Sequence, residues 1–84
     1  MRYLYTARFL RSFKKFDEAV RDDIIQAVEL FERKEDIGVL KIHKLHGKFK
    51  KWHAFSENFS YRIIIKIEKD TTYYLDVGIH DIYK

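Results

Sequence analysis

The chain contains no cysteine and no proline among its 84 residues. The absence of cysteine excludes a disulfide scaffold and a thiolate metal site, and it is consistent with a reducing cytosol. No apolar run approaches the roughly 18 residues that a membrane helix needs, and the N-terminus lacks the pattern of a signal peptide. No repeat, low-complexity stretch or linker divides the sequence. We therefore expect a single domain over residues 1–84, cytoplasmic and without a membrane partner.

Aromatic and basic residues are plentiful. Hydrophobic residues make up 46% of the sequence, with seven Phe, six Tyr and one Trp. A chain this short buries only roughly 60–65% of its unfolded surface, so a dense aromatic core suits a thin domain with one layer of helices on one sheet. Lys and Arg number 17 against 13 Asp and Glu, and the position of this modest excess is more informative than its size.

The first half of the chain has helical periodicity after one short strand. Residues Tyr3–Arg8 alternate as a strand with one buried face would. Three phenylalanines then recur at helical spacing, which predicts a helix over about residues 9–16 with its aromatic stripe in the core. Asp17 is placed to cap a second helix over about residues 17–34, which has the strongest periodic signal in the sequence. The short connection between them predicts an antiparallel helical hairpin.

The period changes from 3.6 to 2 in the second half. Strands are predicted at Lys48–Ser56, Ser60–Ile67 and Thr72–Val77, with turns at Glu57–Asn58 and Lys69–Asp70. Consecutive strands joined by short turns form an antiparallel meander. The order β-α-α-β-β-β therefore predicts an α+β fold: a twisted antiparallel sheet with the helical hairpin packed on one face and the other face open to solvent.

Alternation assigns the strand residues to these two faces. On the second meander strand, the apolar set that begins at Tyr61 is expected to face the helices, which leaves Arg62 on the open face. On the first meander strand, we expect Trp52 and Ala54 toward the helices. The residues expected on the open face there are Lys51, His53 and Phe55. The last strand is expected to present one apolar face made of Tyr73, Leu75 and Val77. The residues expected to be among the most buried are Val20, Ile24, Val28, Phe31, Trp52, Ile63, Ile65, Leu75 and Val77.

The open face is expected to be cationic. The lysines that flank it are Lys41, Lys44, Lys48 and Lys50, in addition to Lys51 on the face itself. Lysine and arginine attract phosphates, and an exposed ring such as that of Phe55 offers a stacking platform for an unpaired base. Histidine transfers protons near neutral pH, which makes His80, just past the last strand, a candidate for catalysis. No Asp or Glu joins His43, His46 and His53 in a metal-ligand pattern, so we expect no metal and no cofactor.

Three segments appear in an order and spacing that resemble a known family. They are His43–Gly47, Tyr61–Ile65 and Leu75–Tyr83. They resemble the H-x-L-x-G stretch, the YR-apolar strand and the G-x-H-D-x-x-Y ending of the RelE/ParE superfamily of toxins, and the order of elements matches as well. The sequence departs from that pattern twice. Tyr83 follows His80 by three residues where the family usually has four, and His53 stands where RelE has a lysine.

The resemblance implies a toxin of a type II toxin–antitoxin system that cuts mRNA in the ribosomal A site. An mRNA interferase of this kind uses the RNA 2′-hydroxyl as the nucleophile and needs no metal. The implied roles are a general acid at His80, a phosphate clamp at Arg62, and a base at His53 or His46; the part played by Tyr83 stays open. The implied RNA-binding residues are Lys44, Lys48, Lys50, Lys51 and Phe55. The implied partners are a cognate acidic antitoxin, the ribosome and mRNA.

Other interpretations remain open. Arg62 is also placed to be a solvated strand residue that pairs with Glu57 or Glu68, and His80 to cap a strand end. The same fold serves ParE-like toxins, which inhibit DNA gyrase without nuclease chemistry. A third class is a non-enzymatic module that binds nucleic acid or a protein. The cluster of histidine and arginine favours the nuclease, because a pure binder has no need for several titratable groups on one face.

Overall fold

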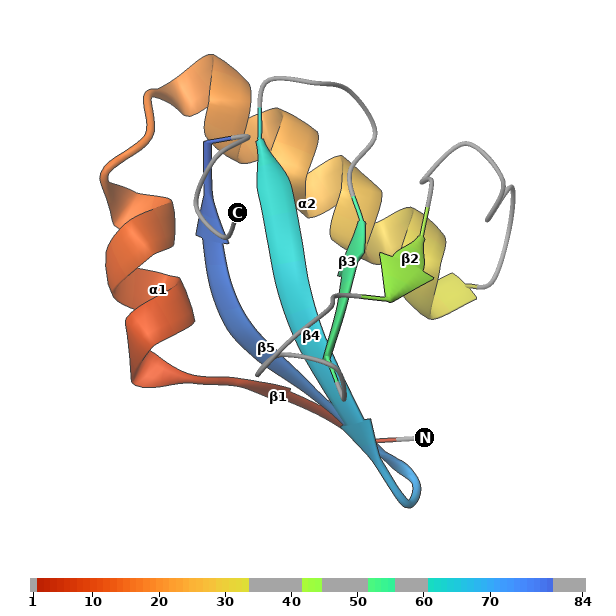
Figure 1. The fold of residues 1–84 in the computed structure, drawn as a ribbon. Coiled ribbons are helices and arrows are strands. Elements are labelled where there is room, and N and C mark those ends of the chain that lie inside the picture. The colour runs from red at the N-terminus through yellow and green to blue at the C-terminus, as the bar shows by residue number, and fades with distance from the viewer. Residues whose placement is uncertain (1, 34–41, 45–51, 56–60, 80–84) are drawn as a thin grey trace.

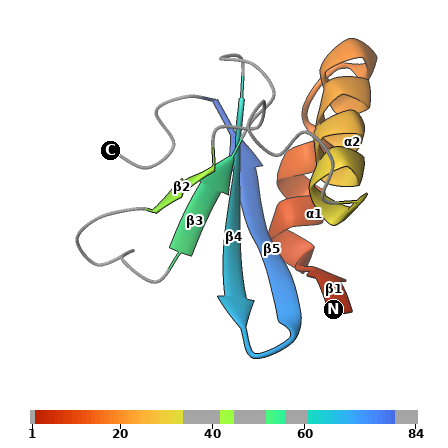
Figure 2. The same ribbon diagram turned by 90° about the vertical axis from the view of Figure 1, so that its right-hand side faces the viewer.

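The computed structural model describes residues 2–33, 42–44, 52–55 and 61–79. Its elements are β1 (Arg2–Tyr5), α1 (Ala7–Lys14), α2 (Glu18–Arg33), β2 (His43–Lys44), β3 (Trp52–Phe55), β4 (Arg62–Glu68) and β5 (Thr71–Gly78). Figure 1 shows one curved sheet, and Figure 2 shows that both helices lie on the same face of it. This is the predicted α+β architecture. Within the described residues, no helix is long and apolar enough to cross a membrane.

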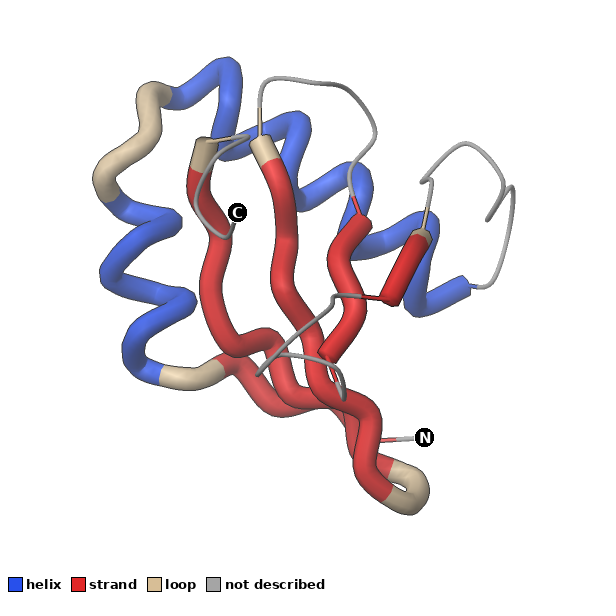
Figure 3. Tube along the Cα trace, in the orientation of Figure 1, coloured by secondary structure: helices blue, strands red, loops and turns tan. Residues whose placement is uncertain are grey.

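The five strands follow the order β1-β5-β4-β3-β2 across the sheet. β3, β4 and β5 form the predicted antiparallel meander. β1 pairs with β5 in parallel, with Arg2 opposite Thr71 and Tyr5 opposite Tyr74, so the sheet is mixed rather than purely antiparallel. Two helices separate β1 from the rest of the sheet in the sequence, and a crossover of this length permits parallel pairing. The two-residue strand β2, which was not predicted, lies at the opposite edge (Figure 3).

The transition from β1 to α1 occurs at Thr6, earlier than predicted. Thr6 has an extended backbone, with φ −69° and ψ 158°, and its Oγ1 accepts a hydrogen bond from the amide of Phe9. The same hydroxyl donates to the carbonyl of Tyr74 at 2.8 Å. A threonine that satisfies a first-turn amide is a favourable N-cap. Arg8, which was expected on a strand, therefore lies in the first turn of α1.

The second helix begins where the sequence predicts. The Oδ1 atom of Asp17 accepts a hydrogen bond from the amide of Val20 at 3.0 Å, and its carbonyl accepts one from the amide of Arg21 at 2.9 Å. The side-chain contact satisfies the Val20 amide, which would otherwise lack an intrahelical partner, and the carbonyl contact is the first intrahelical hydrogen bond. Asp17 is therefore confirmed as the N-cap, and α2 is helical as far as Arg33, the last described residue before the predicted end.

The main core fills the space between the helices and the sheet. Its buried members are Phe9, Ile24, Ala27, Val28, Phe55, Tyr61, Ile63, Ile65, Tyr74 and Val77. The predicted aromatic stripe is confirmed as part of this layer: Phe9 and Phe13 lie on α1, and Phe16 lies two residues beyond its end, with Phe13 and Phe16 partly buried. Val20 and Phe31 are likewise partly buried at the edge of the core. Tyr61, Ile63 and Ile65 of the predicted helix-facing set of β4 are confirmed, because all three are buried in the main core. Ile67, the last member of that set, is 44% exposed.

A second, smaller cluster lies on the opposite face of the sheet. Ala54 and Ile64 are buried in it, and Trp52 and Leu75 pack against them. The prediction that Trp52 and Ala54 face the helices is therefore wrong, and Leu75 does not share the face of Val77 as expected. On β3 the reason is register: Phe55 lies opposite Ile63 and Trp52 opposite Lys66. Directly opposed residues share a face, so the odd-numbered residues of β3 are the ones that face the helices.

On β5 the reason is a β-bulge. Tyr74 lies opposite Ile65, whereas Asp76 lies opposite Ile64, so Leu75 is left without a partner in the ladder between β4 and β5. An extra residue of this kind changes which side chains reach each face. Tyr74 and Val77 both face the main core although they are three residues apart. The predicted apolar face of β5 is therefore interrupted, and only Val77 of its three members lies in the main core.

A cluster of tyrosines ties β1 and β5 to the end of α2. The rings of Tyr5 and Tyr74 stack with their centres 4.6 Å apart. Both hydroxyls donate to the Oε2 atom of Glu32, each at 2.7 Å. Burial, and then the hydrogen bond to the Glu32 carboxylate, raise the pKa of Tyr74 far above its ordinary value and raise that of Tyr5 by less.

We expect the protein to lose stability as the pH rises above about 10. Unfolded tyrosine ionises near that pH, whereas the folded state keeps Tyr74 protonated, so its stabilisation is complete below about pH 10 and declines above it. Tyr74→Phe should make this decline shallower, at a loss of about 1 kcal/mol near neutral pH. Urea midpoints between about pH 8 and 11 measure the effect. Tyr73→Phe, on the other face of β5, is the control, and a decline as steep in Tyr74→Phe as in the wild type would contradict the prediction.

Candidate functional site

The face of the sheet away from α1 and α2 is the far face. Its side chains include Trp52 and Ala54 of β3, Arg62, Ile64 and Lys66 of β4, and Tyr73 and Leu75 of β5. Ala54 and Ile64 are fully buried at its centre. Polar and aromatic groups therefore surround a small apolar centre on this face.

Two cations stand on the far face of β4. Arg62 and Lys66 are four residues apart, which is about 13 Å along a strand. Lys66 forms an ion pair with Oε2 of Glu68 at 2.9 Å, and its Nζ lies 5.9 Å from the centre of the Tyr73 ring. The attraction of Lys66 for a phosphate is therefore partly offset by a carboxylate that it already contacts.

Arg62 has a different neighbourhood. It is the first residue of β4, it is partly exposed, and it lies opposite Gly78 on β5. Because glycine has no side chain, another backbone or a ligand can approach this position closely. A guanidinium can donate to two oxygens of one phosphate. The prediction that Arg62 lies on the face away from the helices is confirmed, and its neighbourhood is compatible with binding of a phosphate.

Phe55 and His53 lie on the other side of the sheet. Phe55 is only 1% exposed, and its ring stacks on that of Phe31 with the centres 4.7 Å apart. His53 lies opposite Ile65 and therefore shares this helix-facing side. Within the part of the chain that the structure describes, its buried Nδ1 has no hydrogen-bond partner. The predicted facing of both residues is wrong, and neither is brought to the same face as Arg62.

Of the remaining candidates, one belongs to the described residues and six do not. Lys44 is exposed on β2 opposite His53, which assigns it to the helix-facing side. The candidates that lie outside the described residues are His46, Lys48, Lys50, Lys51, His80 and Tyr83. Among residues 2–33, 42–44, 52–55 and 61–79, no group of three or more His, Cys, Asp or Glu side chains could hold a metal ion.

Trp52 is a far-face residue that the sequence reasoning missed as a candidate. It is the single tryptophan of the chain, it is partly buried, and it lies next to Ala54 on β3. A partly exposed indole on a strand beside an arginine-bearing strand is a suitable platform for a nucleic-acid base. The residue type was an available signal, but the facing was not. The facing depends on which residue of β4 pairs with each residue of β3, and alternation within each strand does not determine that register.

Comparison with known proteins finds matches by structure but none by sequence. No protein-family model matches the sequence, and no curated protein matches it. Solved structures match over nearly the whole chain. YafQ from E. coli strain BL21(DE3) is 15% identical with a TM-score of 0.79, and the match covers 96% of each chain.

Two further structures give the same result. The YoeB/ParE toxin from Agrobacterium tumefaciens is 13% identical with a TM-score of 0.75, covering 95% of this chain and 99% of that one. A chain of the toxin–antitoxin complex RelBE2 from Mycobacterium tuberculosis is 15% identical with a TM-score of 0.74, covering 93% and 95%. The chain has the RelE/ParE toxin fold. At this level of identity the likeness concerns the fold, and it confirms the RelE-like architecture that the sequence motifs implied.

We expect Phe55→Ala to lower the free energy of unfolding by about 3–5 kcal/mol, because it removes a fully buried ring from the main core. Trp52→Ala should cost less, since the indole is only partly buried. Urea denaturation measures both. A free energy of unfolding that Phe55→Ala leaves unchanged would show that the ring is not buried in the main core.

Proposed function

We propose that this protein is the toxin of a type II toxin–antitoxin pair and that it cuts mRNA on the ribosome. The observation that carries the proposal is Arg62, a guanidinium on the far face of a RelE-like sheet and opposite a glycine. The motifs around Arg62 and His80 support the same reaction, because both resemble motifs of RelE-type nucleases. Two of the similar structures are named as a toxin and as a toxin–antitoxin complex, which supports the toxin role.

The proposed reaction is an internal transfer at one phosphodiester. The 2′-oxygen forms a bond to phosphorus while the bond from phosphorus to the 5′-oxygen breaks, which leaves a 2′,3′-cyclic phosphate and a free 5′-hydroxyl. A base takes the proton of the 2′-hydroxyl, and an acid gives a proton to the departing 5′-oxygen. Between these events the phosphorane carries extra negative charge, and a nearby cation stabilises it.

Each of these roles has a candidate residue in this chain. Arg62 stabilises the phosphorane, and its planar fork holds two phosphate oxygens. His80 is two residues beyond Gly78 in the sequence and donates the proton to the 5′-oxygen. We assign the base to His46, since His53 shares the helix-facing side with Ile65. Lys48, Lys50 and Lys51 attract the RNA backbone, and Tyr83 is a further candidate for contact with the substrate.

We expect His80→Ala to lower the rate of cleavage by about 10²–10⁴-fold, the usual contribution of a positioned acid. Arg62→Ala should lower the rate and also weaken RNA binding, and Arg62→Lys should restore only part of the loss, because an ammonium lacks the two-pronged contact. The measurement is single-turnover cleavage on programmed ribosomes, with the melting temperature of each variant checked. The double variant should lose less than the product of the two single losses, because both residues act on one transition state.

Two variants of the same chain are matched controls for this experiment. Lys66→Ala removes a cation from the same strand and face as Arg62, and His53→Ala removes a histidine from the opposite face. Both should cleave at nearly the wild-type rate. Near-normal cleavage by folded His80→Ala would remove His80 from the mechanism. Gyrase-dependent DNA cleavage in cells, without mRNA cleavage, would favour the gyrase-inhibiting class instead.

An apolar groove on the helical side supports a protein partner. The groove has a volume of about 350 Å³ and lies between α1 and α2. Leu10 and Ile25 line it and remain 44% and 47% exposed. Exposed apolar surface of this kind marks interaction sites in soluble proteins. We propose that an antitoxin segment covers this groove with apolar side chains, while the acidic character of the antitoxin gives a salt-sensitive attraction to the basic chain.

We expect overproduction of the protein alone to arrest growth, and co-production of a small acidic protein encoded beside it to relieve the arrest. Ile25→Glu should still arrest growth but should no longer be relieved, because a carboxylate in the groove opposes an apolar partner. The control is Gln26→Glu, which places the same charge on the neighbouring exposed position of α2. Full relief of the Ile25→Glu arrest would show that the groove is not the antitoxin site, and a harmless wild type would argue against the toxin role.

A further inference from the structure

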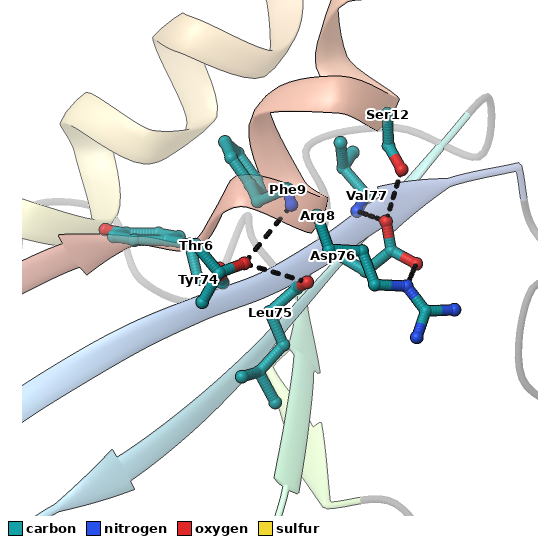
Figure 4. A network of polar contacts seen from close by, with 8 residues as sticks. All are labelled: Thr6, Arg8, Phe9, Ser12, Tyr74, Leu75, Asp76 and Val77. Atoms are coloured by element: carbon teal, nitrogen blue, oxygen red, sulfur yellow. Dashed lines mark hydrogen bonds and ion pairs between the residues drawn. The ribbon is translucent and has the colours of Figure 1, made fainter.

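A nearly buried carboxylate on β5 has a structural role that the proposed chemistry does not use. Asp76 is 4% exposed, and all of its described polar contacts are drawn in Figure 4. Its Oδ1 accepts hydrogen bonds from the Ser12 hydroxyl at 2.6 Å and from the amide of Val77 at 2.9 Å. Its Oδ2 accepts one from Nε of Arg8 at 3.1 Å. The carboxylate therefore joins α1 to β5.

The three contacts are unequal. The Arg8 side chain is 66% exposed whereas that of Asp76 is 6% exposed, so solvent weakens their ion pair. The Ser12 contact is the shortest of the three, and the Val77 contact comes from the backbone amide of the next residue in the same strand. The attachment of Asp76 to α1 therefore depends mainly on the Ser12 hydroxyl, with Arg8 contributing at the surface.

Asp76 lies at the place where β5 changes its register against β4. Below the bulge Tyr74 lies opposite Ile65; above it Val77 lies opposite Ile63 and Gly78 lies opposite Arg62. Without the bulge, the lower register would continue. Leu75 would then lie opposite Ile64, Asp76 opposite Ile63, and Val77 opposite Arg62.

The alternative register has a defined cost. Ile63 is fully buried in the main core, so its new neighbour would be the Asp76 carboxylate, removed from Ser12 and Arg8. A carboxylate buried without partners is strongly unfavourable. Val77 would also leave the core, since a slip of one residue moves each following side chain to the other face. The observed register avoids both penalties and places a glycine, rather than a valine, beside Arg62.

We propose that Asp76 is a positioning residue that locks β5 in the bulged register. The lock keeps Gly78 opposite Arg62 and sets the point on the sheet from which the chain continues to His80, two residues later in the sequence. This inference rests on the proposed nuclease function only in its consequence for the rate of cleavage. The register itself is a property of the folded chain.

Two variants at position 76 distinguish the effect of a changed register from the effect of losing the carboxylate. Asp76→Leu keeps the length of the strand and removes the penalty against the slipped register. We expect the substituted leucine to lie opposite Ile63, and single-turnover cleavage at saturating enzyme to fall at least about 10²-fold, because even a misplacement of about 1 Å has such an effect. Deletion of Asp76 instead gives a regular ladder in which Leu75 pairs with Ile64 and Val77 still pairs with Ile63. It should cleave within a few fold of the wild type.

Cross-strand nuclear Overhauser contacts between the backbone protons of β4 and β5 measure the pairing directly. The control is Asp76→Asn, which retains the Oδ1 acceptor and should keep the wild-type contacts and the wild-type rate of cleavage. Should Asp76→Leu not fold, Asp76→Ala serves in its place, because alanine needs less room opposite Ile63. Wild-type pairing in the leucine or alanine variant would overturn the lock. Loss of cleavage in a deletion variant with correct pairing would overturn the positioning role. Absence of cleavage by the wild type would contradict the proposed function, and the pairing data would still decide whether the lock exists.

Discussion

The contacts of the Asp76 carboxylate with Ser12 and Arg8 link α1 to β5, and so join the two layers of this small domain. β1 accompanies β5 only as far as Tyr74, and α1 begins just after β1 ends. Beyond that point Ser12 and Arg8 of α1 contact the second half of β5. The same carboxylate lies at the bulge, so the attachment of the helix and the register of the strand depend on one side chain.

The consequences of that register appear on both faces of the sheet. On the helix-facing side, Tyr74 and Val77 reach the main core together, and Tyr74 also reaches Glu32 at the end of α2. On the far face, Leu75 joins Ala54 and Ile64, and Gly78 lies beside Arg62. A chain of this length has few residues to supply both clusters. The bulge lets a single strand contribute to each of them and still place a glycine beside the arginine.

The similarity to solved toxin structures concerns the packing of the fold and not the individual side chains. Identity of 13–15% leaves few shared residues, yet the chain superposes on these structures over nearly its whole length. A fold is maintained by apolar residues at the correct period and of about the correct volume, and many sequences satisfy that requirement. Function depends on particular side chains, so the fold leaves it open and the proposal depends on Arg62, His80 and their tests.

The sequence by itself determined what local periodicity controls. Spacing within one element, where a helix or strand imposes its own repeat, accounts for the helices of about residues 9–16 and 17–34, the Asp17 cap, the meander, and the facing of Ile63 and Arg62.

The tertiary structure decided what depends on how elements pack against one another. The facing of Trp52, His53 and Phe55 was set by the register in which β3 pairs with β4. The parallel pairing of β1, the small strand β2, and the bulge at Leu75 were likewise set by partners distant in the chain. The energy of strand pairing comes from residues far apart in the sequence, so the sequence of one strand does not reveal it. The Asp76 carboxylate, for example, bonds to Ser12, 64 residues earlier, and this contact leaves no periodic pattern in β5.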